Sequence, residues 1–271
     1  MSTAADTWTE ALASWAIPEE ILAKAPESPW HFPVGVFARR GEAAGSQLTF
    51  SNHRALEVLP DGGSVLDVGC GGGAASIPLA ATASLLTGVD TSTEMLNAFL
   101  ENARSTGVEA VAIEGPWPEV AEHTPVADVV VCHHVVYNAS NLGAFALELT
   151  GRARIRVVIE LTQRHPTSDL DPLWLRFHGL VRPMRPTSDD AAAVIQELGL
   201  HPKRKDWSAA RPGGYGSVQE MVAHVRRLVC LPAERDPEIR EAIAHRIVER
   251  DGMFGFVDRP VTTLWWEGSG N

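Results

Sequence analysis

Hydrophobic and polar positions follow two different periods along the chain. Short apolar runs typical of buried strands occur at 64–68, 84–89, 110–114, 127–133 and 154–161. Stretches with apolar residues at helical spacing lie between them, at 74–81, 92–104 and 142–149. Strands that alternate with helices of about ten residues form right-handed crossovers and a parallel sheet covered on both faces. The pattern therefore predicts a doubly wound α/β core.

The segments that flank this alternation are less regular. Residues 1–58 hold short helical stretches and several prolines, and we expect them to form an N-terminal helical cap before a core at 59–271. Within the core, residues 163–186 interleave prolines with aromatic residues. This insertion either acts as a lid over a substrate or packs on the core.

The C-terminal part of the core carries a helical insertion at 217–252. Its second predicted helix places Ile239, Ile243 and Ile247 on one face, because they recur every four residues. A last strand is expected at 261–266.

Composition and charge narrow the class of partner. The formal charge of −11 argues against nucleic acid as a partner, because affinity for phosphate backbones depends on Lys and Arg. The three cysteines, Cys70, Cys132 and Cys230, lack the spacing of a metal site or disulfide framework, so no metal is expected. The N-terminus lacks a signal-peptide pattern, and no run of about 18 apolar residues occurs. We therefore expect a soluble, cytoplasmic protein that does not bind membranes.

A glycine-rich loop follows the first strand, as Gly69-Cys70-Gly71-Gly72-Gly73. Glycines let the backbone approach a ligand, and a helix that starts after the loop would add partial positive charge. Asp90, at the end of the next strand, can accept hydrogen bonds from both ribose hydroxyls of an adenosine. These two features suit NAD as well as other adenosine cofactors.

Asp67 distinguishes NAD from the other adenosine cofactors. It lies two residues before Gly69, where a dinucleotide-binding fold usually has an apolar residue beside a pyrophosphate. A fixed carboxylate would repel phosphate but could pair with an ammonium or sulfonium cation. The sequence therefore favours a cationic adenosine cofactor.

Three motifs in order carry a resemblance to a known family. They are Val65-Leu66-Asp67-Val68-Gly69-Cys70-Gly71-Gly72-Gly73, then Gly88-Val89-Asp90, then Ala127 to Asn138 with the run Cys132-His133-His134-Val135-Val136-Tyr137-Asn138. Over roughly residues 60 to 162 the chain resembles the class I S-adenosylmethionine-dependent methyltransferases. The resemblance implies a Rossmann-like, mostly parallel sheet of seven strands in the order 3-2-1-4-5-7-6, with the last strand antiparallel.

The resemblance also implies roles for individual residues. Gly69, Gly71 and Gly73 would line the methionine and ribose parts of the cofactor, together with the loop residue Cys70. Asp67 would help to hold the amino group, and Asp90 the ribose.

The adenine contacts are implied by the same resemblance. Thr91 or Met95 fits the position that packs on adenine. The acid that commonly follows the third strand is missing, since the chain reads Glu114-Gly115-Pro116-Trp117. Trp117 could stack on adenine or donate its backbone amide, and Glu114 could substitute for the acid.

Candidate catalytic residues lie at the end of the fourth strand: His133, His134, Tyr137 and Asn138. Adjacent residues on a strand point to opposite faces, so at most one of the two histidines should face the pocket. His133 is also a candidate for cofactor contact. Ordinary packing is the alternative for both histidines.

We therefore expect methyl transfer from S-adenosylmethionine to a small-molecule acceptor, mainly by proximity and alignment, with S-adenosylhomocysteine as product. One alternative is a non-catalytic protein that binds S-adenosylmethionine or S-adenosylhomocysteine. Another is an NAD-dependent oxidoreductase, which Asp67 opposes. The sequence is also compatible with a homodimer.

Overall fold

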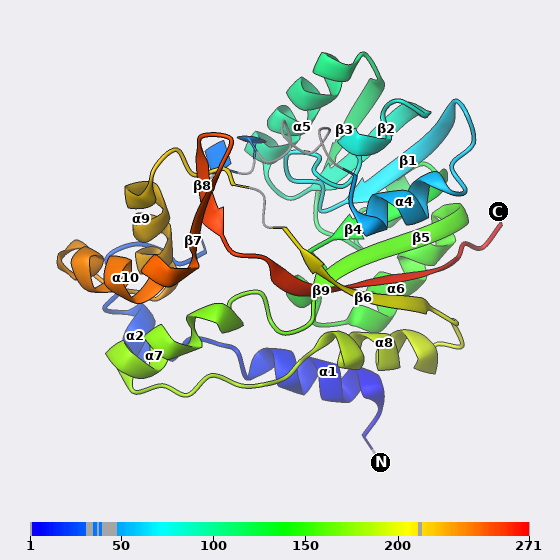
Figure 1. Ribbon diagram of the computed structural model, residues 1–271. Helices are drawn as coiled ribbons and strands as arrows, with labels where there is room; N and C mark the ends of the chain where they lie inside the picture. The colour runs from blue at the N-terminus through cyan, green and yellow to red at the C-terminus, as the bar shows by residue number, and fades with distance from the viewer. Residues whose placement is uncertain (1, 31–34, 37, 40–47, 211–212, 271) are drawn as a thin grey trace.

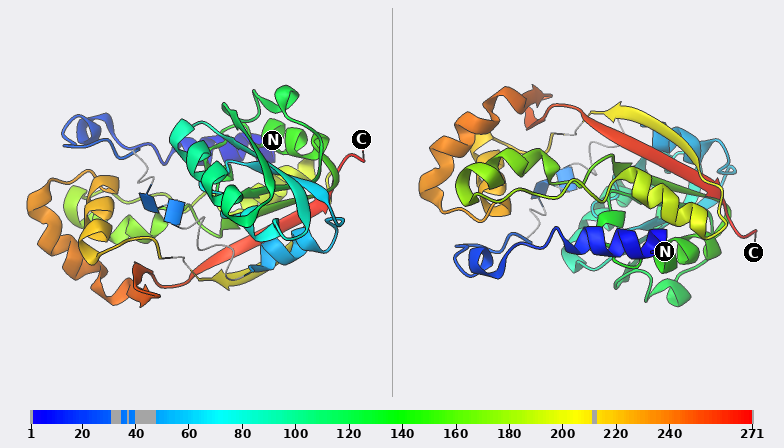
Figure 2. Two further views of the ribbon diagram at one scale, coloured as in Figure 1. Left: turned by 90° about the horizontal axis from the view of Figure 1, so that it is seen from above. Right: turned by 90° about the horizontal axis from the view of Figure 1, so that it is seen from below.

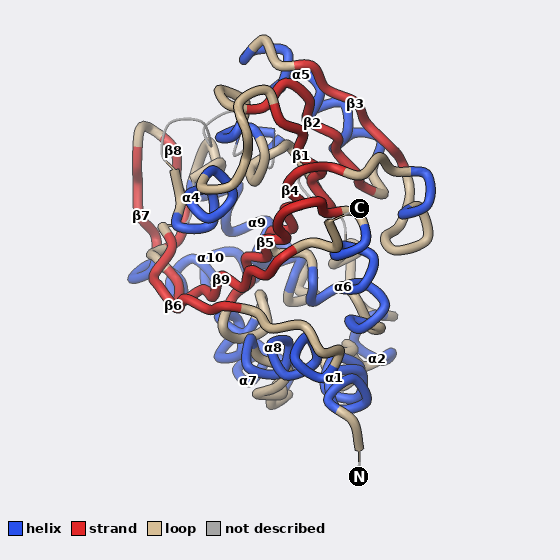
Figure 3. The backbone as a smooth tube through the Cα atoms, turned by 90° about the vertical axis from the view of Figure 1, so that its right-hand side faces the viewer, coloured by secondary structure: helices blue, strands red, loops and turns tan. Residues whose placement is uncertain are grey.

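The computed structural model describes residues 2–30, 35–36, 38–39, 48–210 and 213–270. Its central feature is a seven-stranded sheet of order β3-β2-β1-β4-β5-β9-β6 (Figures 1 and 3). The strands are β1 (Gly63–Val68), β2 (Ala83–Asp90), β3 (Glu109–Glu114), β4 (Ala127–His133), β5 (Ala153–Thr162), β6 (Lys203–Ala209) and β9 (Arg259–Glu267). β9 pairs antiparallel with β5 and β6, and the other pairings are parallel. The predicted strand order and antiparallel last strand are confirmed, with the last strand numbered β9.

Helices cover both faces of the sheet. One face packs on α1 (Ala4–Ala13), α6 (Leu142–Gly151) and α8 (Ser188–Glu197), and the other on α4 (Phe50–Leu56) and α5 (Thr93–Thr106). The sequence of β1 is almost wholly apolar because both of its faces are covered. Leu66 and Val68 face the first layer of helices, and Val65 faces the second. A strand buried on both faces has no polar side.

A smaller helical body lies beside the sheet (Figures 1 and 2). It contains α2 (Glu19–Leu22), α7 (Asp171–His178), α9 (Val218–Leu228) and α10 (Asp236–Ile243), which share an apolar core of their own. The hairpin of β7 (Ile247–Arg250) and β8 (Met253–Phe256) joins this helical body to β9. Among the described residues, no helix combines the length and apolar character that crossing a membrane requires.

The described helices of 1–58 lie in three places. Helix α1 packs on α6 and α8, α2 belongs to the helical body, and α4 covers the opposite face of the sheet. The buried Trp8 anchors α1, because its indole N–H donates to the carbonyl of Ala139 at 2.8 Å.

Two expectations about local structure are wrong. No α-helix forms at 74–81, where turns lead into a short 3₁₀ helix at Ile77–Leu79, since Pro78 has no N–H and its ring opposes an α-helical turn before it. The second helix of the insertion ends at Ile243, and Ile247 begins β7.

Candidate cofactor and acceptor site

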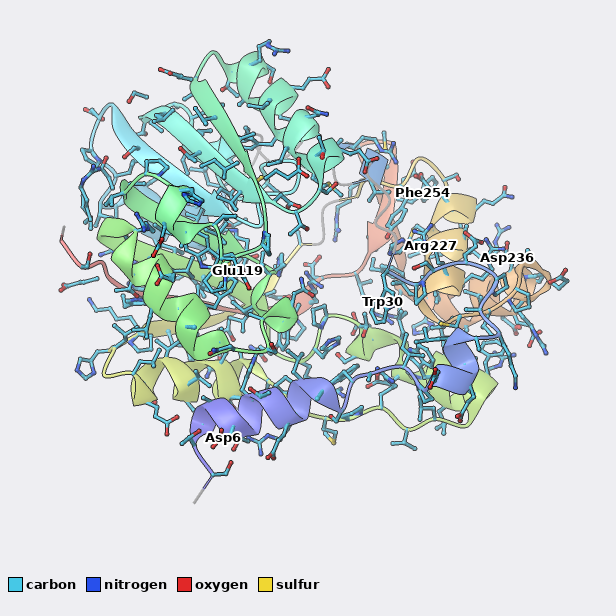
Figure 4. All side chains as sticks on the ribbon, turned by 180° about the vertical axis from the view of Figure 1, so that it is seen from behind. Asp6, Trp30, Glu119, Arg227, Asp236 and Phe254 are labelled. Carbon is cyan, nitrogen blue, oxygen red and sulfur yellow. The ribbon has the colours of Figure 1, made fainter. Side chains whose placement is uncertain are left out.

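A cavity of about 1140 Å³ opens at the carboxyl ends of β1, β2, β4 and β5. Its other walls come from α9, the β7–β8 hairpin and the start of β9. Figure 4 shows Arg227 on α9 and Phe254 on the β7–β8 hairpin at one side of the molecule, and Glu119, in the turn after β3, at the other side. Ligands of open α/β sheets bind at this edge, so the cavity is the candidate site.

The glycine loop forms one wall of the cavity. The amides of Gly69 and Cys70 both donate to the carbonyl of Val89, at 2.8 and 3.0 Å. Gly69 has φ of 71°, and a Cβ there would lie 2.4 Å from a methyl carbon of Val135, so only glycine fits. Gly71 also has positive φ, but a Cβ there would meet nothing within 4 Å. Gly71 therefore leaves open space where a ligand can approach the backbone.

The other two loop candidates differ in their access to the cavity. Gly73 does not line the cavity, and a Cβ there would lie 2.7 Å from the Ile77 side chain. Cys70 lines the cavity but is largely buried. Burial raises the pKa of its thiol well above the usual range, so Cys70 stays protonated at neutral pH.

Asp67 is buried in β1, two residues before Gly69, and does not itself line the cavity. Its Oδ2 accepts a hydrogen bond from the Ser76 hydroxyl at 2.5 Å, whereas its Oδ1 is buried without a hydrogen-bond partner among the described residues. Burial raises the pKa of Asp67 to about 7, and the nearby Asp90 adds to this while Ser76 opposes it. A buried carboxylate oxygen with no donor is suited to a cationic ligand group.

Asp90 faces the cavity and also holds the loop. Its Oδ2 accepts from the amide of Gly71 at 2.9 Å, and its Oδ1 accepts from the amide of Ser92 at 3.0 Å. Each carboxylate oxygen can accept a second hydrogen bond. Ribose hydroxyls could therefore bind Asp90 without displacing the loop.

The residues expected at adenine lie along the same wall. Thr91, Met95 and Trp117 all line the cavity. The Trp117 indole donates to the carbonyl of Phe145 at 3.2 Å, which fixes the ring at the cavity wall. Glu114 is exposed, does not line the cavity and accepts from the Thr93 hydroxyl at 2.8 Å, so it does not replace the missing acid.

Both histidines line the cavity, so the argument from strand alternation is wrong. β4 ends at His133, and His134 turns out of the strand with φ of 62°. Burial lowers the pKa of His133 to about 4, so its imidazole is neutral at neutral pH. Its Nε2 is buried without a partner among the described residues.

The other two catalytic candidates, Tyr137 and Asn138, differ in whether they reach the cavity. Asn138 lines the cavity, but Tyr137 lies in the core, stacked on Trp8, and its hydroxyl donates to the carbonyl of Thr162 at 2.7 Å. Burial raises the pKa of Tyr137 above its usual range. The catalytic assignment of Tyr137 is therefore withdrawn, because its hydroxyl is committed to a backbone carbonyl away from the cavity.

Sequence reasoning missed Glu160, near the end of β5. This buried carboxylate lines the cavity, lies 3.0 Å from His134 Nε2 through Oε1, and accepts from the Ser51 hydroxyl at 2.6 Å through Oε2. Burial raises the pKa of Glu160, but both histidines and the Ser51 hydroxyl outweigh this and lower it to about 2. The signal was a single acid in the apolar run Val157 to Leu161.

In the part of the chain that the structure describes, no three His, Cys, Asp or Glu side chains are grouped to hold a metal ion.

Comparison with known proteins agrees with this geometry. A family model described as a methyltransferase domain matches residues 65–150. A ubiquinone biosynthesis O-methyltransferase from Rickettsia felis is 31% identical over 90 residues, and one from Rickettsia canadensis is 32% identical over 85 residues. These matches cover 33% and 31% of this chain, and the chain spans about a third, 36%, of the length of each relative.

Solved structures show the same fold at low identity. The YcgJ protein from Bacillus subtilis superposes with a TM-score of 0.53 at 17% identity, covering 80% of this chain and 97% of that one. A magnesium protoporphyrin IX methyltransferase from Synechocystis, with bound S-adenosylhomocysteine, gives a TM-score of 0.52 at 16% identity and covers 88% of this chain and 95% of that one. Residues 65–150 therefore match a methyltransferase domain, and they lie within a sheet whose fold is that of these solved structures.

Proposed function

We propose that this protein transfers a methyl group from S-adenosylmethionine to a small-molecule acceptor. The observation that carries the proposal is the buried Asp67 Oδ1, which has no donor among the described residues and lies two residues before Gly69. The amino group of the cofactor would bind this oxygen, and its ribose would bind Asp90. Gly71 leaves room for the part of the cofactor that joins its amino group to its ribose. Thr91, Met95 and Trp117 would enclose the adenine.

The bound cofactor supplies an activated methyl carbon, so the chain has chiefly to hold and align the acceptor. The cavity of about 1140 Å³ exceeds the usual range of about 300–1,000 Å³ for one small-molecule site, which supports two adjoining ligands.

The acceptor would lie on the side of the cavity formed by the predicted cap and insertions. Asn52 from 1–58, Pro166 from 163–186, and His224 and Arg250 from 217–252 all line the cavity. We propose that these three segments together form the acceptor pocket around the core at 59–271. The names of the Rickettsia relatives support an oxygen atom as the methyl acceptor.

The proposed compartment is the cytoplasm. All three cysteines are free and buried, which is consistent with a reducing environment.

Calorimetric titration with S-adenosylmethionine, S-adenosylhomocysteine and NADH in parallel tests the cofactor assignment. We expect binding of the first two and none of NADH, because Asp67 would repel a pyrophosphate. NADH binding alone would replace the proposal with an oxidoreductase.

Turnover is tested separately, by measuring S-adenosylhomocysteine formed with catechol and other small phenols, alcohols, amines and thiols. Cofactor binding with no turnover across this panel would favour a non-catalytic binding protein.

A further inference from the structure

A ladder of aromatic rings leads from the core of the sheet toward the helical body. It begins with Trp8 and Tyr137, whose rings stack with centroids 5.5 Å apart. Tyr137 meets His165 edge to face at 5.5 Å, and His165 stacks on Trp15 at 3.8 Å. Trp8 and Tyr137 belong to the hydrophobic core that the sheet shares with α1, α6 and α8. The ladder therefore starts inside the sheet's own core.

Arg182 continues the ladder into the helical body. Its guanidinium carbon lies 4.9 Å from the centre of the Trp15 ring and 5.0 Å from that of the Trp174 ring, and indole faces attract guanidinium groups. Trp174 lies in α7 and belongs to the separate apolar core of the helical body. His165, which also stacks on Trp15, stays neutral because burial and then Arg182 lower its pKa to about 3. A single buried cation therefore joins the two cores.

Hydrogen bonds hold the Arg182 side chain in this position. Its Nη2 donates to the Trp15 carbonyl, and its Nη1 donates to the Ala16 carbonyl at 3.4 Å. Trp15 is fixed in turn, because its indole N–H donates to the carbonyl of Arg185 at 2.6 Å. Arg182 is only 8% exposed, and burial lowers its pKa while the nearby Asp171 opposes this effect. The guanidinium is thus a buried charge with defined partners.

A buried charge of this kind favours one arrangement over others. Taking a charge out of water is costly, and apolar side chains of similar volume often give equal or greater stability at such sites. An arginine has a planar fork of N–H groups with fixed directions, whereas an apolar side chain packs in several ways. The two carbonyls and two ring faces around Arg182 suit one orientation of its fork. Arg182 therefore selects one placement of Trp174 relative to Trp15.

Two rings of the ladder directly precede residues of the cavity wall. Tyr137 precedes Asn138, and His165 precedes Pro166 and Thr167. These three neighbours all line the cavity. His165 Nδ1 accepts from the Thr167 amide at 3.4 Å and lies 3.0 Å from the Thr167 hydroxyl oxygen. The ladder therefore links the wall at 166–167 to the wall at the end of β4.

We propose that Arg182 is a positioning residue that fixes the helical body against the sheet and thereby sets the geometry of the acceptor side of the cavity. α9 and the β7–β8 hairpin form the facing wall, so their placement decides where an acceptor lies relative to the transferable methyl group. The part of this inference that concerns the acceptor rests on the proposed function. Arg182 does not line the cavity, so it acts through the residues that it holds.

A distance measurement tests the placement without any ligand. Nitroxide labels at Leu147→Cys in α6 and Arg240→Cys in α10 report the separation of the sheet and the helical body by double electron–electron resonance. Both positions are exposed, and the three native cysteines are buried. Arg182→Met should broaden or shift the distance distribution, because Met fills the space without fixing the two indoles. An unchanged distribution would overturn the proposal.

Further variants separate positioning from stability and from charge. Arg182→Lys keeps the charge but lacks the planar fork, so it should change the distances as Met does. Arg176→Gln is the matched control, because Arg176 is an exposed arginine of α7 that pairs with Glu238, outside the ladder. Wild-type distances in Arg182→Lys, or an equal change in Arg176→Gln, would contradict the role of the guanidinium. A lower urea midpoint with wild-type distances would assign Arg182 a merely structural role.

Ligand measurements test the consequence for the acceptor. In Arg182→Met the dissociation constant of S-adenosylhomocysteine, measured by calorimetry, should stay within about twofold of wild type, because the glycine loop lies on the sheet, away from the substitution. The kcat/KM for catechol should fall by about tenfold or more, because a small misplacement of a reacting group is costly in rate. A comparable loss of cofactor affinity, or an unchanged kcat/KM, would count against a role on the acceptor side.

Two outcomes separate this inference from the proposed function. Wild-type protein that does not bind S-adenosylhomocysteine would overturn the proposed function, and the distances alone would then decide whether Arg182 places the helical body. Wild-type protein that binds S-adenosylhomocysteine but methylates neither catechol nor any other member of the panel would overturn the part that concerns the acceptor.

Discussion

The buried carboxyl of Asp67 predicts that cofactor binding releases a proton. In the free protein its pKa is about 7, because burial and then Asp90 disfavour the charged form more than the Ser76 hydroxyl favours it. The proposed ammonium group beside Oδ1 would favour the carboxylate and lower this pKa. A proton bound before the cofactor arrives must therefore leave.

The size of the release follows from the pKa. At pH 7 about half of the free protein carries this proton, so binding should release about half a proton, rising to about 0.9 at pH 6 and falling to about 0.1 at pH 8. By linkage, the dissociation constant should rise, and the affinity fall, by up to about tenfold for each pH unit below 7.

The assay is calorimetric titration with S-adenosylhomocysteine in two buffers of different ionisation enthalpy, such as phosphate and Tris. The difference in apparent binding enthalpy gives the number of protons released. Asp67→Asn is the matched control, because it keeps the shape of the side chain and cannot titrate. Equal proton release by the wild type and Asp67→Asn, or no release from either near pH 6, would refute the placement of the amino group at Asp67.

Asp67 also makes the stability of the protein depend on pH, in the direction opposite to that of an acid whose pKa is lowered by folding. The folded pKa of about 7 lies above the ordinary 3.8, so this contribution to stability is complete below pH 3.8 and is lost as pH rises to about 7. Asp67→Asn should therefore gain stability relative to wild type as pH rises, by at most about 4 kcal/mol above pH 7. Urea denaturation at several pH values measures this, and a constant difference would contradict it.

Three further predictions concern packing and acid stability. Gly69→Ala should lower the free energy of unfolding by about 3 kcal/mol through the clash with Val135, whereas Gly71→Ala should cost about 1–2 kcal/mol and chiefly weaken cofactor binding. Equal urea midpoints for the two would contradict this. Trp8→Phe should cost about 1–3 kcal/mol with unchanged cofactor affinity in calorimetry, since it loses a buried hydrogen bond outside the cavity. Glu160 has a folded pKa of about 2, below the ordinary 4.5, so its stabilisation is present above pH 4.5 and is lost as pH falls through about 2. Glu160→Gln should remove this dependence, as acid titration followed by circular dichroism would reveal.

The sheet was predictable because burial on both faces requires nearly continuous apolar runs, which few other structures tolerate. The prediction of an α-helix at 74–81 was wrong although the sequence held the evidence against it. Pro78 opposes the α-helix that the alanines favour. The loop glycines could be found by spacing, but spacing does not separate Gly69, which packs against the core, from Gly71, which borders open space.

The surroundings of Glu160 and His134 were less predictable. Ser51, which donates to Glu160, and Thr263, whose hydroxyl oxygen lies 2.8 Å from that of Ser51, lie 109 residues before and 103 residues after Glu160 in the sequence, so no local pattern connects them. The positive φ of His134 could not be predicted either, because histidine adopts the left-handed conformation too rarely for its presence in the sequence to indicate it. A lone acid in the apolar run of β5 could have identified Glu160, but only the fold shows which donors satisfy it.

The two amide hydrogen bonds of Asp90 limit how this pocket can be re-engineered. The side chain proposed to recognise the ribose also accepts from Gly71 and Ser92, so replacing it changes the shape of the loop as well as the ligand contact. A variant intended for a different sugar would have to supply new acceptors for both amides before its selectivity could be judged. Directed changes in cofactor preference should therefore start at the adenine wall near Thr91 and Met95, and leave position 90 intact.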